Sequence, residues 1–280
     1  MLPRDSGAWI RVAAVAVGVL ILAAAEGVGY ASLDVQTMRI LRWTIRLTGL
    51  GLVAVFLAGR RIDRWAADTL IRADAWLLED NRRSTAILVA LMVGYVTLWN
   101  GVTFLRHYFF HSNAYDLGIQ DQVVWNTAHG HPFESSFEVK NYFGDHVRPY
   151  LALLSVAYLV QPSPYVLLAF QSLALACTAW PLYHLARRRF SSPAVGLVVA
   201  FCALAYPAVG FVNRDNFHME IVAVPLLAAA YERIDGGDLV KASVWAGLAL
   251  LAKEDIGLAV AGLGVVAALR YRRWRFGLNW

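Results

Sequence analysis

Long runs of apolar residues alternate with short polar turns along most of this chain. Many of the runs approach 20 residues, which is enough for a helix to cross a bilayer core about 30 Å thick. The pattern predicts crossing helices at residues 8–31, 40–59, 85–105, 165–186, 193–212 and 220–231, followed by an apolar block at 241–269. We therefore expect an all-α, polytopic helical membrane protein with about 7–8 spans.

Three segments depart from the plain crossing pattern. Residues 150–160 are apolar over too short a stretch to cross, which predicts an interfacial or re-entrant helix. The block 241–269 is interrupted by charged residues at 253–255, so we expect two short helices meeting there, with one long tilted helix as the alternative. Residues 60–84 read as an amphipathic helix along the membrane surface, and a plain polar connector is the alternative.

Composition supports a membrane protein and excludes several other classes. Of the 280 residues, 59% are hydrophobic and 16% are charged, which is too apolar for an ordinary soluble domain. The net charge of +5 comes from short clusters at the ends of apolar runs, so it indicates membrane lipids as partners and no nucleic acid. Cys177 and Cys202 both lie inside apolar runs, which argues against a disulfide framework.

The distribution of lysine and arginine predicts the orientation. If the N-terminus is cytoplasmic, most of the 25 basic residues fall on the inner side, including the run at 187–189. The same orientation places residues 106–149 and the turn at 213–220 outside. For Lys241 and Arg270 both to be inside, the last apolar block must enter the membrane and return.

The external loop 106–149 concentrates groups that can do chemistry. It holds five of the seven histidines together with several carboxylates. Two further polar clusters, at 215–220 and 253–255, are expected on the same side. Carboxylates and imidazoles can act as general bases or metal ligands, and ionisable groups at membrane depth are usually paired and often functional. For the three charges at 253–255, an ion pair that locks helices together is an equal alternative.

Several short motifs in this half of the chain resemble one family. They occur in this order: Tyr115-Asp116-Leu117-Gly118-Ile119, Asp121-Gln122, Trp125-Asn126, Gly144-Asp145-His146 with Pro149, Phe217-His218-x-Glu220, and Lys253-Glu254-Asp255. Together they resemble a family of predicted bacterial membrane proteins known as domain of unknown function 2079. The resemblance extends over roughly residues 94–275, and it implies a multi-pass protein of the bacterial inner membrane.

That family in turn resembles the GT-C glycosyltransferases, multi-span enzymes that use polyprenyl-phosphate sugars. The resemblance implies a GT-C-like fold, a polyprenyl-phosphate lipid donor, and a catalytic acid in the first long external loop, where Asp116 stands. Asp116 and Asp121 are the predicted catalytic residues. The predicted substrate-binding residues are Asp145, His146, Arg148, His218, Glu220, Lys253, Glu254 and Asp255. A divalent metal ion is a candidate cofactor, with Asp145, His146, His218 and Glu220 as candidate ligands, although the spacing of His218 and Glu220 suits a shared metal only in extended or turn backbone.

Two functional hypotheses stay open at this point. In the first, the protein is a glycosyltransferase; in the second, it is a non-catalytic transporter or scaffold whose charges line a path or lock helices. We expect residues 1–84 to form an added pair of spans with a cytoplasmic amphipathic linker. Residues 85–280 would then form the GT-C-like core, which we expect to be truncated because later spans of a GT-C enzyme are missing.

Overall fold

A computed structural model describes residues 60–112, 114–137, 141–144 and 146–271. The chain divides into two compact units, Met1–Ala73 and Asp74–Trp280. Helix α3 (Arg60–Glu79) begins in the first unit and ends in the second, so the expected helix in this region is present. Everything below concerns the second unit.

Most helices of this unit follow one another with short connections, and a longer segment, residues 129–149, joins α5 to α6. Their bounds are α4 Asn81–Tyr108, α5 Ala114–Ala128, α6 Tyr150–Tyr158, α7 Pro164–Cys177, α8 Ala179–Phe190, α9 Pro193–Leu204, α10 Pro207–Arg214, α11 Ala223–Gly236, α12 Leu239–Leu250 and α13 Ile256–Tyr271, with short 3₁₀ turns η2 at Tyr142–Gly144 and η3 at Met219–Val222. Among the described residues, β structure is limited to one isolated bridge between Glu134 and Asn141. The all-α prediction is therefore confirmed for this part of the chain.

In the described part of the chain, two helical stretches are long and apolar enough to cross a bilayer, Asn81–Tyr108 and Pro164–Phe190. A third qualifies if α9 and α10, which meet at an angle of 42°, form one bent span. The number of 7–8 spans is not confirmed: the first two expected crossings, at 8–31 and 40–59, lie outside the described residues, and α12 and α13 are shorter apolar helices.

Local sequence explains where these helices begin. The Asp80 side chain accepts a hydrogen bond from the Arg82 amide and caps the start of α4. Helices α7 and α9 each begin with a serine cap followed by a proline in the first turn, at Pro164 and Pro193. Serine or aspartate satisfies a free N–H there, and proline has no N–H to satisfy. Proline also opens α10, at Pro207, where the bend occurs.

The last apolar block consists of two short helices. Helix α12 ends at Leu250 and α13 begins at Ile256, so the charged residues 253–255 lie in the turn between them. The Tyr271 hydroxyl near the end of α13 donates to the Ile234 carbonyl near the end of α11, just before α12 begins. The chain therefore reverses direction between α12 and α13, which brings the end of α13 back to the end where α12 begins. This is the arrangement predicted from Lys241 and Arg270, and the alternative of one long helix is wrong.

Side chains from several helices fill two main cores. One core joins α5, α6 and α7 around Leu151, Leu167 and Phe217, all fully buried. The other joins α4, α7, α8 and α9 around Leu88 and Tyr183. Helices α8 and α9 approach closely because residue 196 is glycine: a Cβ atom there would lie 2.8 Å from the Tyr183 ring.

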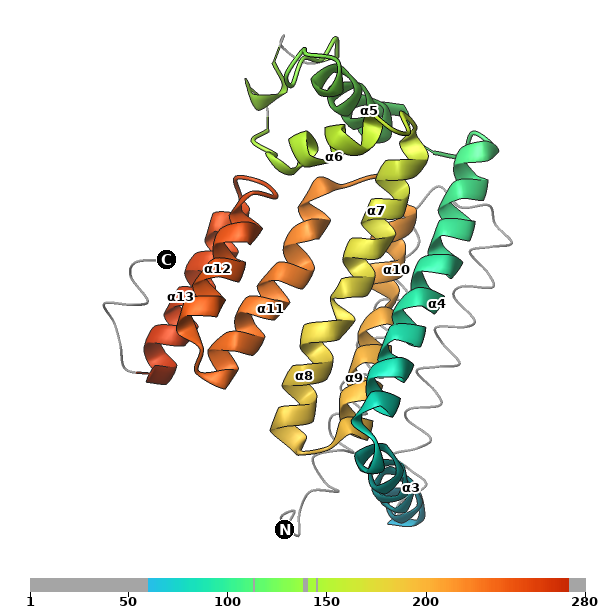
Figure 1. Ribbon diagram of the computed structural model, residues 1–280, viewed down its shortest axis with the longest axis vertical. Helices are drawn as coiled ribbons and strands as arrows, with labels where there is room; N and C mark the ends of the chain where they lie inside the picture. The colour runs from blue at the N-terminus through green and yellow to red at the C-terminus, as the bar shows by residue number, and fades with distance from the viewer. Residues whose placement is uncertain (1–59, 113, 138–140, 145, 272–280) are drawn as a thin grey trace. The chain divides into compact units, whose positions relative to one another are not determined.

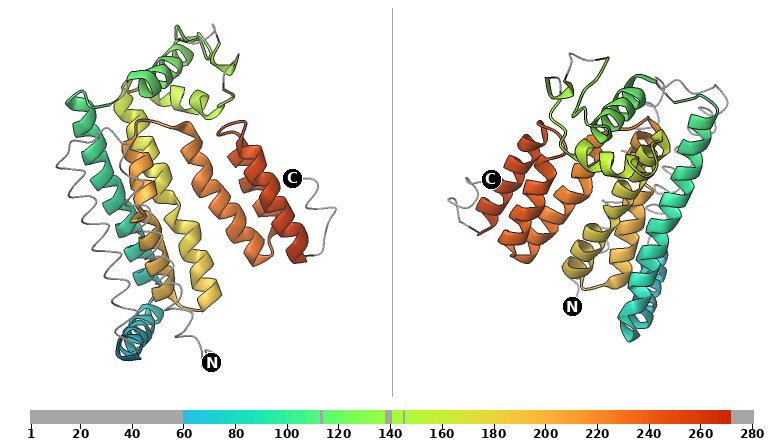
Figure 2. Two further views of the ribbon diagram at one scale, coloured as in Figure 1. Left: turned by 180° about the vertical axis from the view of Figure 1, so that it is seen from behind. Right: turned by 45° about the horizontal axis from the view of Figure 1, so that its top comes forward.

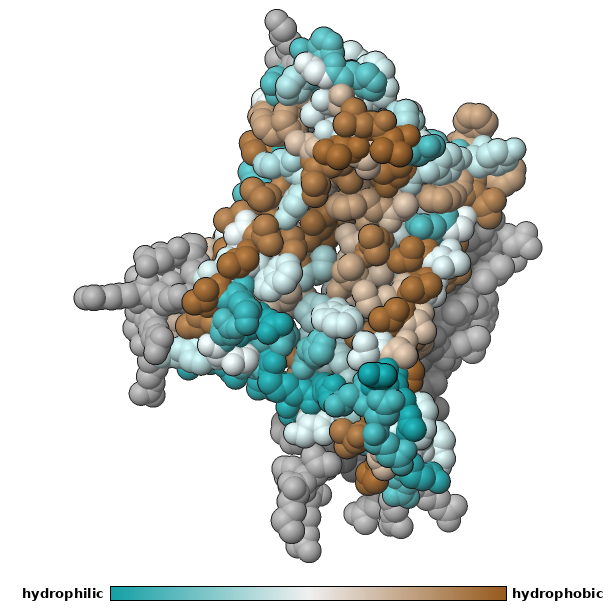
Figure 3. All heavy atoms as spheres, viewed as in Figure 1, coloured by the Kyte–Doolittle hydropathy of each residue, from teal (hydrophilic) through white to brown (hydrophobic). Residues whose placement is uncertain are grey.

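Polar groups gather at two opposite ends of the helical layer, and hydrophobic residues cover much of the face between them (Figure 3). At one end α5 and α6 lie across the ends of the long helices, as Figures 1 and 2 show from three directions. The turns α10–α11 and α12–α13 lie at this same end. The predicted grouping of loop 106–149 with these two turns is therefore confirmed, whereas the side of the membrane that they face stays a prediction.

Ion pairs join three helices at the other end. The Asp235 carboxylate, only 3% exposed, pairs with Arg188 at 3.2 Å, with Arg270 at 3.1 Å and with Arg189. Glu232 pairs with Arg188 at 2.6 Å. Because these arginines come from α8 and α13 and the acids from α11, the group fixes three helix ends together. We call Arg188, Arg189, Arg270, Glu232 and Asp235 the arginine clasp.

We expect the two ends to face opposite sides of the membrane, with the arginine clasp in the cytoplasm. After replacement of both native cysteines, His131→Cys should react with an impermeant thiol reagent on intact cells, and Ser191→Cys should react only after permeabilisation. Both positions are exposed in the structure. Labelling of Ser191→Cys but not of His131→Cys in intact cells would show that the orientation is reversed.

Candidate functional site

Three turns from different parts of the chain bring charged residues together at the α5–α6 end. The first precedes α6, the second connects α10 to α11, and the third connects α12 to α13. Direct contacts join them. The residues that take part are His146, Arg148, His218, Glu220, Lys253, Glu254 and Asp255, and we call this group the polar cluster.

Glu254 ties the α12–α13 turn to the segment before α6. Its two carboxylate oxygens each lie 3.0 Å from a nitrogen, one from the ring Nδ1 of His146 and the other from the backbone amide of Val147. Burial by itself would raise the pKa of Glu254, but the hydrogen bonds from His146 and Val147 outweigh it and lower the pKa to about 2. Glu254 is therefore a stable anion that positions His146.

Arg148 is the most deeply buried charge of the polar cluster, with 9% of its side chain exposed. One guanidinium nitrogen donates to the Tyr142 hydroxyl at 2.8 Å, and the other terminal nitrogen lies 3.4 Å from Glu220. Its Nε atom is buried without a hydrogen-bond partner among the described residues. A buried arginine keeps its charge, so this N–H is an unsatisfied donor next to Glu220.

Glu220 is shared by several partners. Its carboxylate lies 3.4 Å from Arg148, 4.0 Å from the Lys253 ammonium and 3.9 Å from the His218 ring. Lys253 also pairs with Asp255 at 3.2 Å, and 17% of its side chain is exposed. The cluster thus places two cations, Arg148 and Lys253, on either side of one carboxylate.

A buried amide network holds the turn that carries His218 and Glu220. The Gln171 side chain, on α7, donates to the backbone carbonyls of Asn213 and Asn216 and accepts the amide of His218 at 2.8 Å. Gln120, on α5, donates to the Phe217 carbonyl at 2.9 Å. The chain is not helical here, so these side chains replace the backbone partners that a helix would have supplied.

Sequence reasoning missed Gln171 and Gln120. The signal that could have found Gln171 is its position: it is the most polar residue in an otherwise apolar stretch at 164–180, where an amide needs a partner. Gln120 lies inside the motif region, between the predicted catalytic acids Asp116 and Asp121. Neither residue carries a charge, so an inventory of ionisable groups does not include them.

The two predicted catalytic acids point to different places. Asp121 accepts a hydrogen bond from the Tyr158 hydroxyl of α6, and burial raises the pKa of Asp121 although Tyr158 and His107 both act to lower it. Asp116 is partly buried and lies one helical turn before Gln120, hence on the side of α5 that faces the Phe217 turn. Asp116 has no hydrogen bond or ion pair with another described residue.

The proposed metal ligands do not form a metal site in the described part of the chain. No group of three or more histidine, cysteine, aspartate or glutamate residues is placed to hold a metal ion there. His146 engages Glu254, and His218 lies 3.9 Å from Glu220. Asp145, a predicted metal ligand and substrate-binding residue, lies outside the described residues. We therefore derive no chemical step through a metal.

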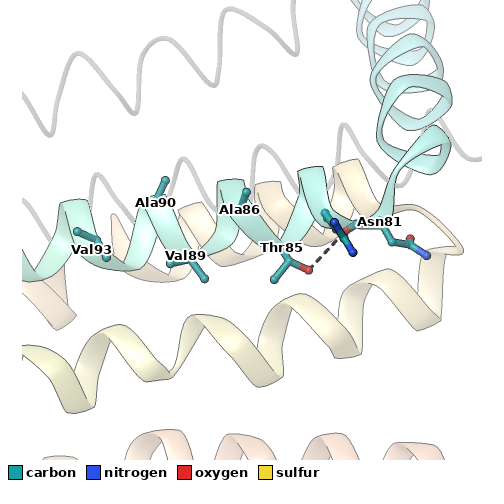
Figure 4. A pocket seen from close by; sticks show the side chains of 7 residues that line it. Asn81, Thr85, Ala86, Val89, Ala90 and Val93 are labelled. Carbon is teal, nitrogen blue, oxygen red and sulfur yellow. Dashed lines mark hydrogen bonds between the residues drawn. The ribbon is translucent and has the colours of Figure 1, made fainter.

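A separate cavity of about 690 Å³ lies along the start of α4, at the opposite end from the polar cluster. Figure 4 shows the described residues that line it: Asn81, Arg82, Thr85, Ala86, Val89, Ala90 and Val93. Its lining is mainly apolar and every one of these residues comes from α4. It carries none of the predicted site residues.

These features define a helical membrane protein with a cluster of charged residues at one end of its helix layer. The chain matches the family described as predicted membrane protein DUF2079 over residues 106–280, and it belongs to that family. The match begins at the first residue of loop 106–149 and includes every residue of the polar cluster. Neither the curated proteins nor the solved structures contain a match.

Replacing Gln171 by leucine should destabilise the protein strongly. The change removes the hydrogen bonds that Gln171 makes to two backbone carbonyls and one amide, at about 1–3 kcal/mol for each lost partner, so a loss on the order of 3 kcal/mol is expected. Thermal unfolding in detergent measures it. The matched control is Gln161→Leu, an exposed glutamine in the α6–α7 connection, which should change stability little; equal effects would contradict the role of Gln171.

The Glu254 contacts should give a defined pH dependence. The pKa of Glu254 is about 2 in the folded protein against 4.5 for the free side chain, so its contribution is complete above pH 4.5 and is lost as the pH falls toward 2. The stability difference between the wild type and Glu254→Gln should therefore be constant above pH 4.5 and shrink below it. A difference that stays constant between pH 5 and pH 2 would contradict these contacts.

Proposed function

We propose that this protein is an integral-membrane glycosyltransferase that takes its sugar from a polyprenyl-phosphate donor. The observation that carries the proposal is the pair of cations, Arg148 and Lys253, on either side of Glu220 at one end of the helix layer. A lipid phosphate approaching from the membrane would meet this end. The proposed side is the outer face of a bacterial inner membrane, with the N-terminus in the cytoplasm.

The cations supply what a phosphate leaving group needs. Arg148 has a buried Nε donor that no described residue uses, and Lys253 carries a compact charge. Charge-assisted hydrogen bonds from both would hold the donor phosphate and would strengthen as negative charge develops on it. Asp255 pairs with Lys253, His218 lies next to Glu220, and His146 is held by Glu254; we assign these four residues, His146, His218, Glu254 and Asp255, to substrate binding and positioning.

Asp116 is the proposed general base. It would accept the proton of an acceptor hydroxyl while that oxygen attacks the anomeric carbon. The bond between the anomeric carbon and the phosphate oxygen breaks, and the polyprenyl phosphate leaves as an anion. The support is positional: Asp116 lies on the same face of α5 as Gln120, whose amide contacts the residue before His218. Asp121, which contacts Tyr158, lies on another face of α5 and serves this step less well.

The second candidate function, a transporter or scaffold, is favoured by a different observation. Most charges of the polar cluster already neutralise one another through the contacts among Arg148, Glu220, Lys253 and Asp255. Such a network can hold helix ends together without any reaction. The bend between α9 and α10 also suits a transporter, in which discontinuous helices line the path.

Asp116→Asn tests the catalytic proposal. Membranes carrying the wild-type protein should transfer labelled sugar from one of a panel of polyprenyl-phosphate donors, and the variant should lose about 10²- to 10⁴-fold of that rate, the usual contribution of a general base. Its thermal unfolding should stay close to that of the wild type, because asparagine keeps the shape of the side chain.

The matched control for this experiment is Glu134→Gln, an exposed acid in the same loop. It should keep full transfer. A fully active Asp116→Asn protein would exclude Asp116 as the base, and absence of transfer by the wild type with every donor of the panel would favour the transporter or scaffold.

A further inference from the structure

Helix α6 is apolar on both of its sides. Its inner side, with Leu151, Leu154 and Tyr158, is buried in the core shared with α5 and α7. Its outer side presents a second apolar stripe at every third or fourth position: Leu153, Val156, Ala157 and Val160 are all exposed. Val160, just past the end of the helix, is 86% exposed. A helix that is apolar all round is stable only when something apolar covers its outer side.

A second exposed apolar group lies at the end of α4. Tyr108, Phe109 and Phe110 are three consecutive aromatic residues with 67%, 59% and 94% of their surfaces exposed. Phe110 also has a backbone φ of +59°, a conformation that is unfavourable for a bulky residue. The chain thus projects a phenylalanine outward at a conformational cost, although no described residue packs around it.

Ring contacts place these two apolar groups at the same level of the molecule. The His107 ring packs edge-on against Tyr165 with centroids 5.0 Å apart, and Phe104 does so at 4.9 Å. Tyr165 lies at the start of α7, only a few residues after Val160. The end of α4 and the end of α6 therefore lie close to the same level along the long helices. At this level the apolar stretch Asn81–Tyr108 ends and the apolar stretch Pro164–Phe190 begins.

Helix α5 and the loop after it provide the polar side. Helix α5 packs on α6, and the exposed residues at its end and beyond are mainly polar, among them His129, His131 and Glu134. Figure 2 shows α5 farther than α6 from the long helices. Apolar side chains thus point outward at the level of α6, and polar ones predominate beyond it.

We propose that α6 and the aromatic residues 108–110 lie in the headgroup region of a lipid bilayer, with α6 parallel to the membrane surface. Helices that lie in the membrane interface sit about 5–10 Å into the boundary between headgroups and acyl chains, and exposed aromatic residues are enriched at the same depth. In α6 the outer apolar side would face the acyl chains, while α5 packs on its inner side. The occupant of the apolar stripe is therefore lipid. The stripe lies next to the start of the apolar stretch Pro164–Phe190, which is long and apolar enough to cross a bilayer.

This placement sets the depth of the polar cluster. Arg148 lies directly before α6, and a helix of this length spans about 12 Å. With α6 parallel to the surface, Arg148 lies at the same depth as Val160 and hence at the level of lipid phosphates. A phosphate could then reach the cluster sideways from the bilayer without leaving the headgroup layer. The placement itself does not depend on the proposed sugar transfer.

Site-specific fluorescence in lipid vesicles tests the proposal. In a chain without Cys177 and Cys202, single cysteines at Val160 and Phe110 are labelled with an environment-sensitive fluorophore, and His131→Cys serves as the water-exposed control. The protein is reconstituted in phosphatidylcholine–phosphatidylglycerol vesicles. We expect blue-shifted emission at 160 and 110, with strong quenching by a lipid that carries a nitroxide near the top of its acyl chain. At 131 we expect quenching by aqueous iodide instead.

Two results would overturn the proposal. Iodide quenching at 160 and 110 as strong as at 131 would show that the stripe faces water. Blue-shifted emission that neither quencher reduces would show that protein covers it, as in contact with a second copy of the chain. Because the experiment measures position and not activity, its outcome is separate from that of the Asp116→Asn transfer assay.

Discussion

The hydrogen bonds of Gln171 to the turn at residues 213–218 are the interaction on which the polar cluster depends. Between α10 and α11 the chain leaves the helical conformation, with Asn216 at a φ of +57°. In an apolar environment each unpaired N–H or C=O costs free energy, so such a break persists only when the protein supplies the partners. Gln171 supplies several of them at once, and Gln120 supplies another. Without the break, His218 and Glu220 would continue a helix and could not meet Arg148.

Glu220, in the same turn, lies between the two cations of the polar cluster. Arg148 and Lys253 both lie next to Glu220, and Lys253 also pairs with Asp255, while Glu254 is used by His146 and a backbone amide. Sharing leaves unused donors, of which the Arg148 Nε is the clearest. A purely structural ion-pair network would be expected to satisfy every buried donor. This incomplete satisfaction is the physical reason that we favour a site that binds an anion.

The sequence predicted the order and direction of the helices and the grouping of the turns, but not the contacts between side chains. The return of the chain at residues 253–255 could be predicted because Lys241 and Arg270 demand the same side of the membrane, and the grouping of the three turns followed from the same rule. The role of Gln171 could not, because it depends on which elements pack together, and the sequence at Pro207 marks a break without giving its angle of 42°. Which of Asp116 and Asp121 faces the Phe217 turn depends on the rotation of α5 about its axis, and the weakly amphipathic sequence of α5 does not specify that rotation.

The arginine clasp has a mechanical consequence. It fixes the ends of α8, α11 and α13 through one nearly buried carboxylate, Asp235, whereas at the far end the turn between α12 and α13 is tied down by a few contacts of Lys253 and Glu254. Because one carboxylate holds arginines of two other helices, the loss of Asp235 would loosen three helix ends at once.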